Sequence, residues 1–192
     1  IQFFLLASFA GETINFCKSW KFHLGDAGKG ASSSSYNDSQ WRILNIPHDW
    51  SIEGTYKQFE NGTDWQSGFL PAGISWYRKT FTIPSKWKNK KVQILFEGVY
   101  LNSEVWINGH WLGKRPNGYI SFVYDLTPYL QENKNQIAVK VDHSKALTGR
   151  WYTGSGIYRP VSCWSVTHPH PYSGSISDPS YKISNLHLHP IL

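Results

Sequence analysis

The chain contains 192 residues, of which 40% are hydrophobic and 17% are charged, and its formal net charge is +6. This length suits one domain with a hydrophobic core, alone or with a tail, and is too short for a (β/α)₈ barrel of about 250 residues. The composition excludes a highly charged disordered chain and a membrane protein. We therefore expect a globular protein with no membrane partner.

The first ten residues, 1–10, are mostly apolar and carry small residues, Ser8 and Ala10, just before Gly11. This pattern resembles the end of a signal peptide and its cleavage site. Because the chain also lacks methionine, we expect a fragment that begins inside such a peptide. The mature protein would then be exported to the periplasm or the medium. A buried first strand is the alternative interpretation of residues 1–10.

From Thr13 onward the pattern predicts β-structure interrupted by turns, because no stretch keeps a helical period over three turns. A short strand is expected at residues 41–46, where Pro47 ends it. The glycines and proline of residues 60–73 predict a long loop. Loops of this length in compact domains usually have a function.

Alternating apolar residues predict strands at 76–83 and 92–96. The basic segment 85–91 lies between them and contains the densest cluster of positive charge. We interpret it as an exposed turn and not as a nucleic-acid site, because stripes that bind phosphate recur along a face. No nucleic-acid partner is expected.

The clearest local signal is the Asn-Gly pair at 108–109, which favours the positive φ angles of a type I′ turn. The flanking strands, 103–107 and 110–113, should therefore form a hairpin. With further strands at 119–124 and 137–141, the pattern predicts an all-β fold, an antiparallel jelly-roll-like β-sandwich.

The ten tryptophans exceed what a core of this size needs, so some should lie at a surface. We assign Trp106 to the strand core and expect loop aromatics to face outward. The sequence predicts neither a metal site nor a disulfide bond. Cys17 and Cys163 have no metal-type spacing, and no pattern of Cys, Asp or Glu accompanies the histidines at 168, 170, 187 and 189.

The composition changes near residue 162. Residues 162–192 contain seven serines, four prolines and four of the eight histidines, with only Asp178 and Lys182 charged. We therefore divide the chain into a signal-peptide remnant at 1–10, a sandwich at 11–166 and an irregular tail at 167–192. A truncated or frame-disrupted gene product is our hypothesis for the tail.

Nine short motifs follow one another over about 150 residues, and each is weak alone. They are Trp20-Lys21-Phe22, Asp38 to Arg42, Ile46 to Trp50, Trp76 to Phe81, Phe96 to Val99, Val105 to Gly109, Gly118-Tyr119, Phe122 to Thr127 and Gly154 to Pro160. In this order they resemble the amino-terminal sugar-binding domain of glycoside hydrolase family 2. That family contains β-galactosidases, β-glucuronidases and β-mannosidases, and the match is most similar to bacterial β-galactosidases.

The resemblance implies a galactose-binding-domain-like sandwich, followed in the intact enzyme by an immunoglobulin-like domain and a barrel. It also implies cleavage of β-linked glycosides with retention by two barrel glutamates about 5 Å apart, without a cofactor. The six glutamates of this chain are Glu12, Glu53, Glu60, Glu97, Glu104 and Glu132. None has a setting similar to the family's catalytic strands, so no catalytic residue and no activity of the isolated chain are expected.

The resemblance places residues 148–153 at the rim of the barrel's pocket. Trp151 or Tyr152 would stack against the apolar face of a pyranose, and Arg150 would donate hydrogen bonds to hydroxyls. The alternative for Trp151 is a plug at the end of the sandwich. Some family members have an acidic residue at the position of Arg150, which leaves a shared ligand role open.

The loop Pro47-His48-Asp49-Trp50 is a second candidate for contact with the sugar. It offers Asp49 and Trp50, although Asp49 can instead cap a turn. Arg159, after the Gly-rich turn, is expected to pair with an internal carboxylate such as Glu97.

Three functions remain open for the chain. The first is a non-catalytic domain of a family 2 glycosidase, with carbohydrate and the missing immunoglobulin-like and barrel domains as partners. The second is a free-standing carbohydrate-binding module, which needs an exposed aromatic platform. The third is a structural domain without a sugar site.

Overall fold

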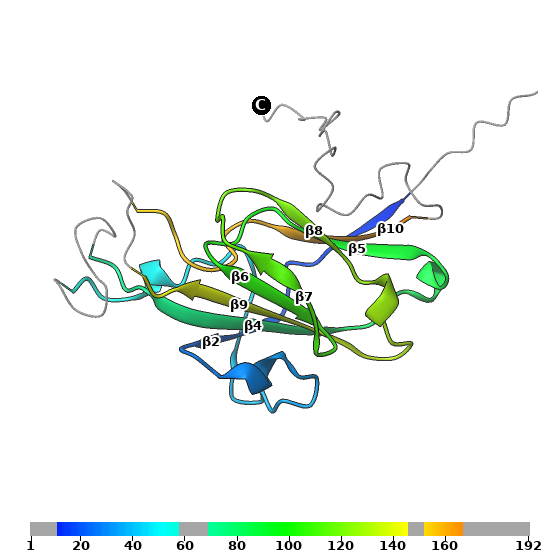
Figure 1. Cartoon of the computed structure of the whole chain (residues 1–192), viewed down its shortest axis with the longest axis horizontal. Helices are drawn as coiled ribbons and strands as arrows, with labels where there is room; N and C mark the ends of the chain where they lie inside the picture. Colours follow the sequence, from blue (N-terminus) through cyan, green and yellow to red (C-terminus); the bar gives the residue numbers. More distant parts are fainter. Residues whose placement is uncertain (1–10, 58–68, 146–151, 167–192) are drawn as a thin grey trace, which may run out of the picture.

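The computed structural model describes residues 11–57, 69–145 and 152–166 (Figure 1). Its strands are β1 (Glu12–Asn15), β2 (Trp20–Leu24), β3 (Arg42–Leu44), β4 (Gly73–Phe81), β5 (Lys91–Phe96), β6 (Ser103–Ile107), β7 (His110–Arg115), β8 (Phe122–Asp125), β9 (Asn135–His143) and β10 (Val161–Val166). Short 3₁₀ turns are η1 (Lys29–Ser32), η2 (Ser51–Glu53), η4 (Ser85–Trp87) and η5 (Thr127–Tyr129). Within these ranges no helix has the length and hydrophobicity needed to span a bilayer.

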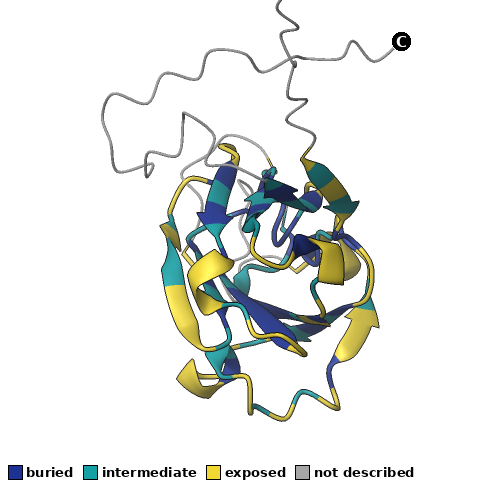
Figure 2. Cartoon of the chain, turned by 90° about the vertical axis from the view of Figure 1, so that its right-hand side faces the viewer, coloured by how far each residue is buried: buried dark blue, intermediate teal, exposed yellow. Residues whose placement is uncertain are grey.

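The strands form two antiparallel sheets. One has the order β1-β10-β5-β8 and the other the order β3-β2-β4-β9-β6-β7. Figure 1 shows the two sheets as stacked layers, and Figure 2 shows that the strands are buried where the layers face each other. The predicted all-β antiparallel sandwich is confirmed.

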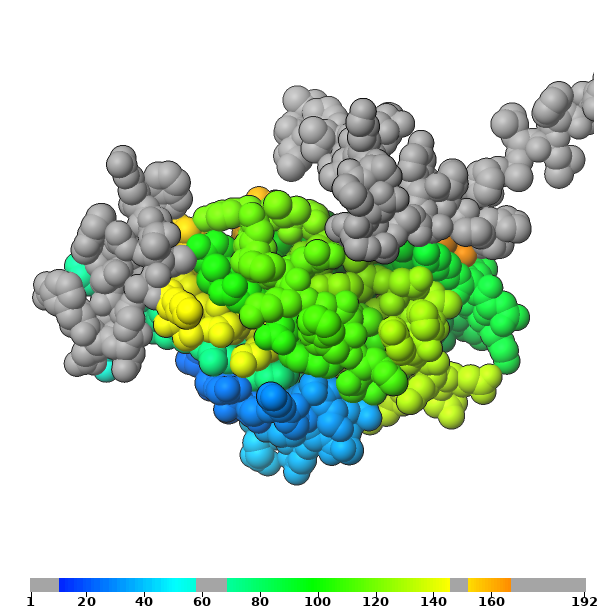
Figure 3. Space-filling model, viewed as in Figure 1, coloured from blue at the N-terminus to red at the C-terminus, as the bar shows by residue number. Residues whose placement is uncertain are grey.

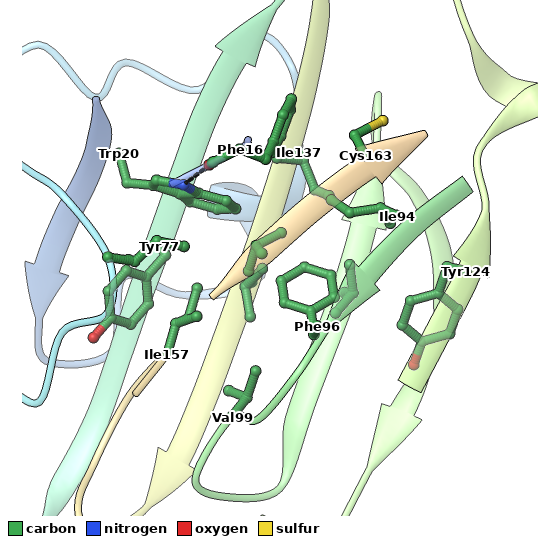
Figure 4. Close-up of a cluster of buried hydrophobic side chains, with 14 of the residues drawn as sticks. Phe16, Trp20, Tyr77, Ile94, Phe96, Val99, Tyr124, Ile137, Ile157 and Cys163 are labelled. Carbon is green, nitrogen blue, oxygen red and sulfur yellow. Dashed lines mark hydrogen bonds between the residues drawn. The ribbon is translucent and has the colours of Figure 1, made fainter. Parts of the chain in front are cut away.

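The core fills the space between the sheets (Figure 4). Alternation along β5 and β10 sends Ile94, Phe96 and Cys163 inward, and all three are fully buried. The indole of Trp20 is also buried, and its Nε1 donates to the carbonyl of Phe16 at 2.7 Å. This bond satisfies a polar group that burial would otherwise leave without a partner.

The hairpin at Asn108-Gly109 is confirmed, with φ angles of 50° and 84° at these residues. Trp106 is partly buried as predicted, but it packs against an outer cluster of Ala31, Trp41 and Trp76 and not in the core between the sheets. On β6 the inward positions are Ser103, Val105 and Ile107, so Trp106 lies on the outer face. A Cβ at Gly113 would meet the ring of Tyr124, which shows that this position of β7 faces the core.

Segment 25–41 crosses the outer face of the six-stranded sheet and buries part of it. Under this segment lies Arg78 of β4, which is 1% exposed. Its Nε donates to Asp38 Oδ2 at 2.8 Å, and its Nη1 donates to the carbonyls of Ala31 and Ser33. Lys21 reaches the other oxygen of Asp38 at 2.6 Å. Burial opposes ionisation of Asp38, but these two cations hold its pKa below the usual range.

The turn between β4 and β5 is confirmed, and its lysines are engaged on the surface. Lys88 pairs with Glu132 at 3.3 Å and Lys86 pairs with Glu12. The expected pairing of Arg159 with Glu97 was wrong. Arg159 is exposed, and its guanidinium lies over the ring of Tyr158. The ion pairs between described residues do not include one between Arg159 and Glu97.

Three expectations concern residues outside the described part of the chain. These are the signal-peptide remnant at 1–10, most of the long loop at 60–73, and the tail at 167–192. They stay predictions.

Candidate functional site

Two segments far apart in the sequence lie side by side at one end of the sandwich. The amide of His48 donates to the carbonyl of Ile157 at 2.8 Å, and the amide of Trp50 donates to the carbonyl of Ser155 at 3.1 Å. These bonds extend the pairing beyond the sheets, so residues 48–50 and 155–157 form one unit.

The carboxylate of Asp49 joins the two segments a second time. Its Oδ1 accepts from the amides of Ser51 at 3.1 Å and Ser155 at 3.0 Å. Its Oδ2 accepts from the hydroxyl of Tyr152. Burial, together with the neighbouring carboxylate, raises the pKa of Tyr152, so the phenol remains a proton donor. We call Asp49, Ser51, Tyr152 and Ser155 the rim clamp.

A series of buried hydrogen bonds connects the rim clamp to the end of β9. Ser51 Oγ donates to the carbonyl of Pro71 at 2.7 Å and lies 2.5 Å from Ser155 Oγ. Ser155 Oγ in turn lies 2.6 Å from His143 Nδ1. Ser155 is fully buried, which excludes it as a nucleophile toward a sugar. The contact of serine with histidine therefore holds the end of β9 against the rim.

Burial also makes His143 a source of acid sensitivity. It lowers the pKa of this side chain from 6.5 to about 4, and the folded protein holds the ring neutral. Between those values the unfolded chain binds a proton that the folded chain does not. The contribution of neutral His143 to the free energy of unfolding is therefore complete above pH 6.5, decreases as the pH falls, and is lost by about pH 4. The expected loss is about 3 kcal/mol, from roughly 1.4 kcal/mol per pH unit.

Urea unfolding between pH 4 and 7 measures this effect. His143→Gln should flatten the slope, and His110→Gln, at an exposed position, should leave it unchanged. Burial also lowers the pKa of His48, so a smaller slope of the same sign should remain. Equal slopes for the wild type and His143→Gln would contradict the assignment.

A second polar cluster lies beside the rim clamp. Glu53 accepts from Arg42 Nη2 at 2.5 Å and from His48 Nε2 at 3.1 Å. On the other side of the imidazole, Nδ1 lies 2.8 Å from the hydroxyl of Tyr77. In the Nε2–H tautomer the ring donates to Glu53 and accepts from Tyr77. In the Nδ1–H tautomer it donates to Tyr77 and accepts from Arg42 Nη2, which lies 3.1 Å from Nε2. Burial opposes ionisation of Glu53, yet Arg42 and His48 hold its pKa below the usual range.

Arg42 and Glu53 border an open groove of about 440 Å³. The groove lies between the β2–β3 edge of the sheet and the η2 turn. Its lining consists of Phe22, His23, Leu24, Gln40, Trp41, Arg42, Trp50, Glu53, Gly54 and Pro71. Apolar side chains with a few charged ones at the edge are typical of small-molecule sites.

The structure brings two of the five predicted site residues together, since Tyr152 donates to Asp49. Trp50 is 2% exposed and belongs to the hydrophobic core. Its ring therefore supports the loop, and this geometry does not favour stacking on a sugar. Arg150 and Trp151 lie outside the described residues, so their roles stay predictions.

His48 belongs to the second candidate loop, but the sequence did not predict its partners Arg42 and Glu53. Arg42 and His48 stand inside the quoted motifs, but nothing in their spacing indicates that both reach one carboxylate. The available signal is that Arg42 and Glu53 lie five residues before and six residues after Pro47, where a turn can bring opposite charges together.

Several carboxylates accept hydrogen bonds from cationic side chains or from backbone amides of turns. Examples are Glu12 with Lys86, Asp38 with Arg78, and Asp142 with the amide of Ser144. A retaining glycosidase instead needs two carboxyl groups about 5 Å apart that are free to react. In the described ranges, no group of three or more His, Cys, Asp or Glu side chains could hold a metal ion.

The fold and the rim define a β-sandwich domain that presents loops from one end. The family model for glycosyl hydrolases family 2, sugar binding domain, matches residues 15–167, and the chain belongs to this family. The resemblance found in the motifs is thereby confirmed, and so is the assignment to the sugar-binding domain of family 2 glycosidases.

Particular relatives sharpen this assignment. The chain is 51% identical over 151 residues to the β-galactosidase BoGH2A of Bacteroides ovatus, covering 78% of this chain and 18% of that protein. It is 35% identical over 170 residues to a β-glucuronidase of Formosa agariphila, covering 82% of this chain and 17% of that protein. The crystal structure of a β-glycosidase from Bacteroides vulgatus is 96% identical, with a TM-score of 0.79, over 80% of this chain and 20% of that one. The chain thus spans about a fifth of the length of these relatives.

Proposed function

We propose that this domain forms part of the substrate rim of a retaining family 2 β-glycosidase that hydrolyses β-galactosides. In the whole enzyme its partners are the carbohydrate, an immunoglobulin-like domain and a catalytic barrel. The observation that carries the proposal is the rim clamp, in which one carboxylate binds both segments at the same end of the sandwich.

The role of Asp49 in this proposal is to position the rim and not to touch the sugar. Both carboxylate oxygens already accept hydrogen bonds from the protein. Because three donors converge on one charged group, the chain between Tyr152 and Ser155 has little freedom to move. Residues 148–153, which the family resemblance places at the pocket, include Tyr152 of the rim clamp.

β-Galactosides are the proposed substrate class because the 51% identical relative is a β-galactosidase. The 35% identical relative is a β-glucuronidase, which makes β-glucuronides the second class to compare. Hydrolysis of 4-nitrophenyl β-galactoside and 4-nitrophenyl β-glucuronide by the full-length enzyme distinguishes the two. Faster turnover of the glucuronide would reject the galactoside assignment without affecting the rim.

Asp49→Ala in the full-length enzyme tests the rim itself. We expect kcat/KM for the aryl β-galactoside to fall about 10- to 100-fold, because small displacements of positioning groups have effects of this size. Tyr152→Phe removes one of the three bonds and should produce a smaller decrease. Glu132→Ala, at a position where the side chain is 84% exposed, is the control and should match the wild type.

The fold must remain intact for this test to count, so circular dichroism and the unfolding midpoint are measured for each variant. An Asp49→Ala enzyme that is folded and retains wild-type kcat/KM would contradict the positioning role.

A further inference from the structure

Three side chains connect the surface beside the rim clamp to the interior of the sandwich. Glu53 Oε1 lies 3.1 Å from His48 Nε2, and His48 Nδ1 lies 2.8 Å from the hydroxyl of Tyr77. A carboxylate, an imidazole and a hydroxyl in this order resemble the series that activates a hydroxyl nucleophile. Tyr77 is fully buried, however, and little of its strand β4 is visible on the face drawn in Figure 3. The hydroxyl therefore cannot reach a substrate, and it acts on its neighbours within the protein.

The nearest of these neighbours is the backbone at the end of the sandwich. A Cβ built on Gly156 would overlap the hydroxyl oxygen of Tyr77 and lie 2.9 Å from the carbonyl oxygen of His48. The hydroxyl thus occupies the space that a side chain at Gly156 would need. The backbone of Ile157, which lies beside Tyr77 in Figure 4, also contacts this hydroxyl. The hydroxyl is therefore located where the two segments joined by Asp49 pair with each other.

The imidazole of His48 makes the connection in both of its neutral forms. With the proton on Nε2 it donates to Glu53 and accepts from Tyr77, and with the proton on Nδ1 it donates to Tyr77 and accepts from Arg42. Burial lowers the pKa of His48 and raises the pKa of Tyr77 well above its usual value, so both groups are neutral at pH 7. The ring of Phe22 lies edge-on to the imidazole, with ring centroids 4.7 Å apart. These contacts fix the orientation of the imidazole.

We propose that Tyr77, held by His48 and Glu53, is a positioning residue for substrate binding. Its hydroxyl fixes the backbone at Gly156, next to Ser155 of the rim clamp. The inference rests on the proposed function, in which the rim borders the substrate, and it adds a support that reaches the rim from β4. These three side chains act through the backbone of the rim and do not touch the sugar.

The hydroxyl and not the ring distinguishes this role from core packing. The ring of Tyr77 packs against Phe22 with centroids 5.0 Å apart, and a phenylalanine would keep that contact. Tyr77→Phe therefore removes only the bond to His48 and the contact with Gly156. Tyr124→Phe is the matched control, because Tyr124 is also buried and lies on β8 of the other sheet, at the opposite side of the core (Figure 4).

Steady-state kinetics of the full-length enzyme test the proposal, with 4-nitrophenyl β-galactoside or β-glucuronide, whichever it hydrolyses faster. We expect Tyr77→Phe to raise KM about 3- to 10-fold and to change kcat less than about twofold, because a loosened rim weakens binding of substrate and transition state alike. Tyr124→Phe should match the wild type in both constants. Glu53→Ala should raise KM as Tyr77→Phe does, and Glu53→Gln, which retains an oxygen acceptor, should recover most of the loss.

Amide hydrogen exchange of the same variants gives a readout that does not depend on turnover. Tyr77→Phe should speed exchange in peptides that cover residues 152–158 and leave peptides of β5 and β8 at wild-type rates. A general loss of packing would instead speed exchange in all of these peptides.

The proposal is overturned by a wild-type KM in the folded Tyr77→Phe enzyme, or by exchange that rises equally in β5 and in residues 152–158. Asp49→Ala separates this failure from a failure of the proposed function. If Asp49→Ala lowers kcat/KM and Tyr77→Phe does not change KM, the rim borders the substrate and only the support from β4 is rejected. If Asp49→Ala also matches the wild type, the proposed function is rejected as well.

Discussion

Replacing Asp38 with alanine is expected to lower the free energy of unfolding by about 3 kcal/mol. The substitution leaves the guanidinium of Arg78, which is 1% exposed, without its carboxylate partner. An unpaired buried charge is costly because the low-dielectric interior does not replace its hydration. For a domain of this size the melting temperature should fall by roughly 6–12 °C.

Urea and thermal unfolding measure this loss, and two further variants interpret it. Glu132→Ala breaks an exposed ion pair and should change stability by less than about 0.5 kcal/mol. Arg78→Met combined with Asp38→Ala removes both charges and should recover part of the loss. A loss below about 1 kcal/mol for Asp38→Ala would show that the buried pair does not secure segment 25–41.

Gly156→Ala is expected to destabilise the domain by about 2–5 kcal/mol and to distort the rim. Gly156 has a φ of 108°, which alone costs an alanine about 1–2 kcal/mol. Its Cβ would also overlap the hydroxyl of Tyr77 and lie 2.9 Å from the carbonyl oxygen of His48. Overpacking of this kind costs a further 1–3 kcal/mol, roughly.

Gly109→Ala is the matched control for this substitution. Gly109 also has a positive φ, 84°, but a Cβ there meets no atom within 4 Å. Its cost should therefore be the conformational term alone, about 1–2 kcal/mol. Equal destabilisation by the two substitutions in urea unfolding would show that close packing behind the rim is not what Gly156 provides.

The fold could be predicted from the sequence because its signals are local. Alternation along β5, β6 and β9 and the Asn108-Gly109 turn depend on residues a few positions apart. The same rule did not assign Trp106 to its cluster, because the alternation shows which residues share a face but not which face a covering segment will bury. Segment 25–41 gives the outer face its own buried cluster of Ala31, Trp41 and Trp76.

The site was harder to predict because its contacts are long-range. The motifs indicated Asp49 and Tyr152, but the bond between them joins residues 103 positions apart. The turn-capping role that the sequence allowed for Asp49 and its contact with Tyr152 occur together, one on each carboxylate oxygen. Trp50 lies in a loop and is predicted to face outward on that ground, yet it packs close to Gly156 and Gly73.

The central claim is that the segments joined by Asp49 border the bound substrate in the whole enzyme. Amide hydrogen exchange of the full-length enzyme, with and without a galactose-configured inhibitor, tests it most directly. We predict that the inhibitor slows exchange in peptides that cover residues 48–51 and 152–156. Slowed exchange in the barrel with no change in these two peptides would contradict the claim.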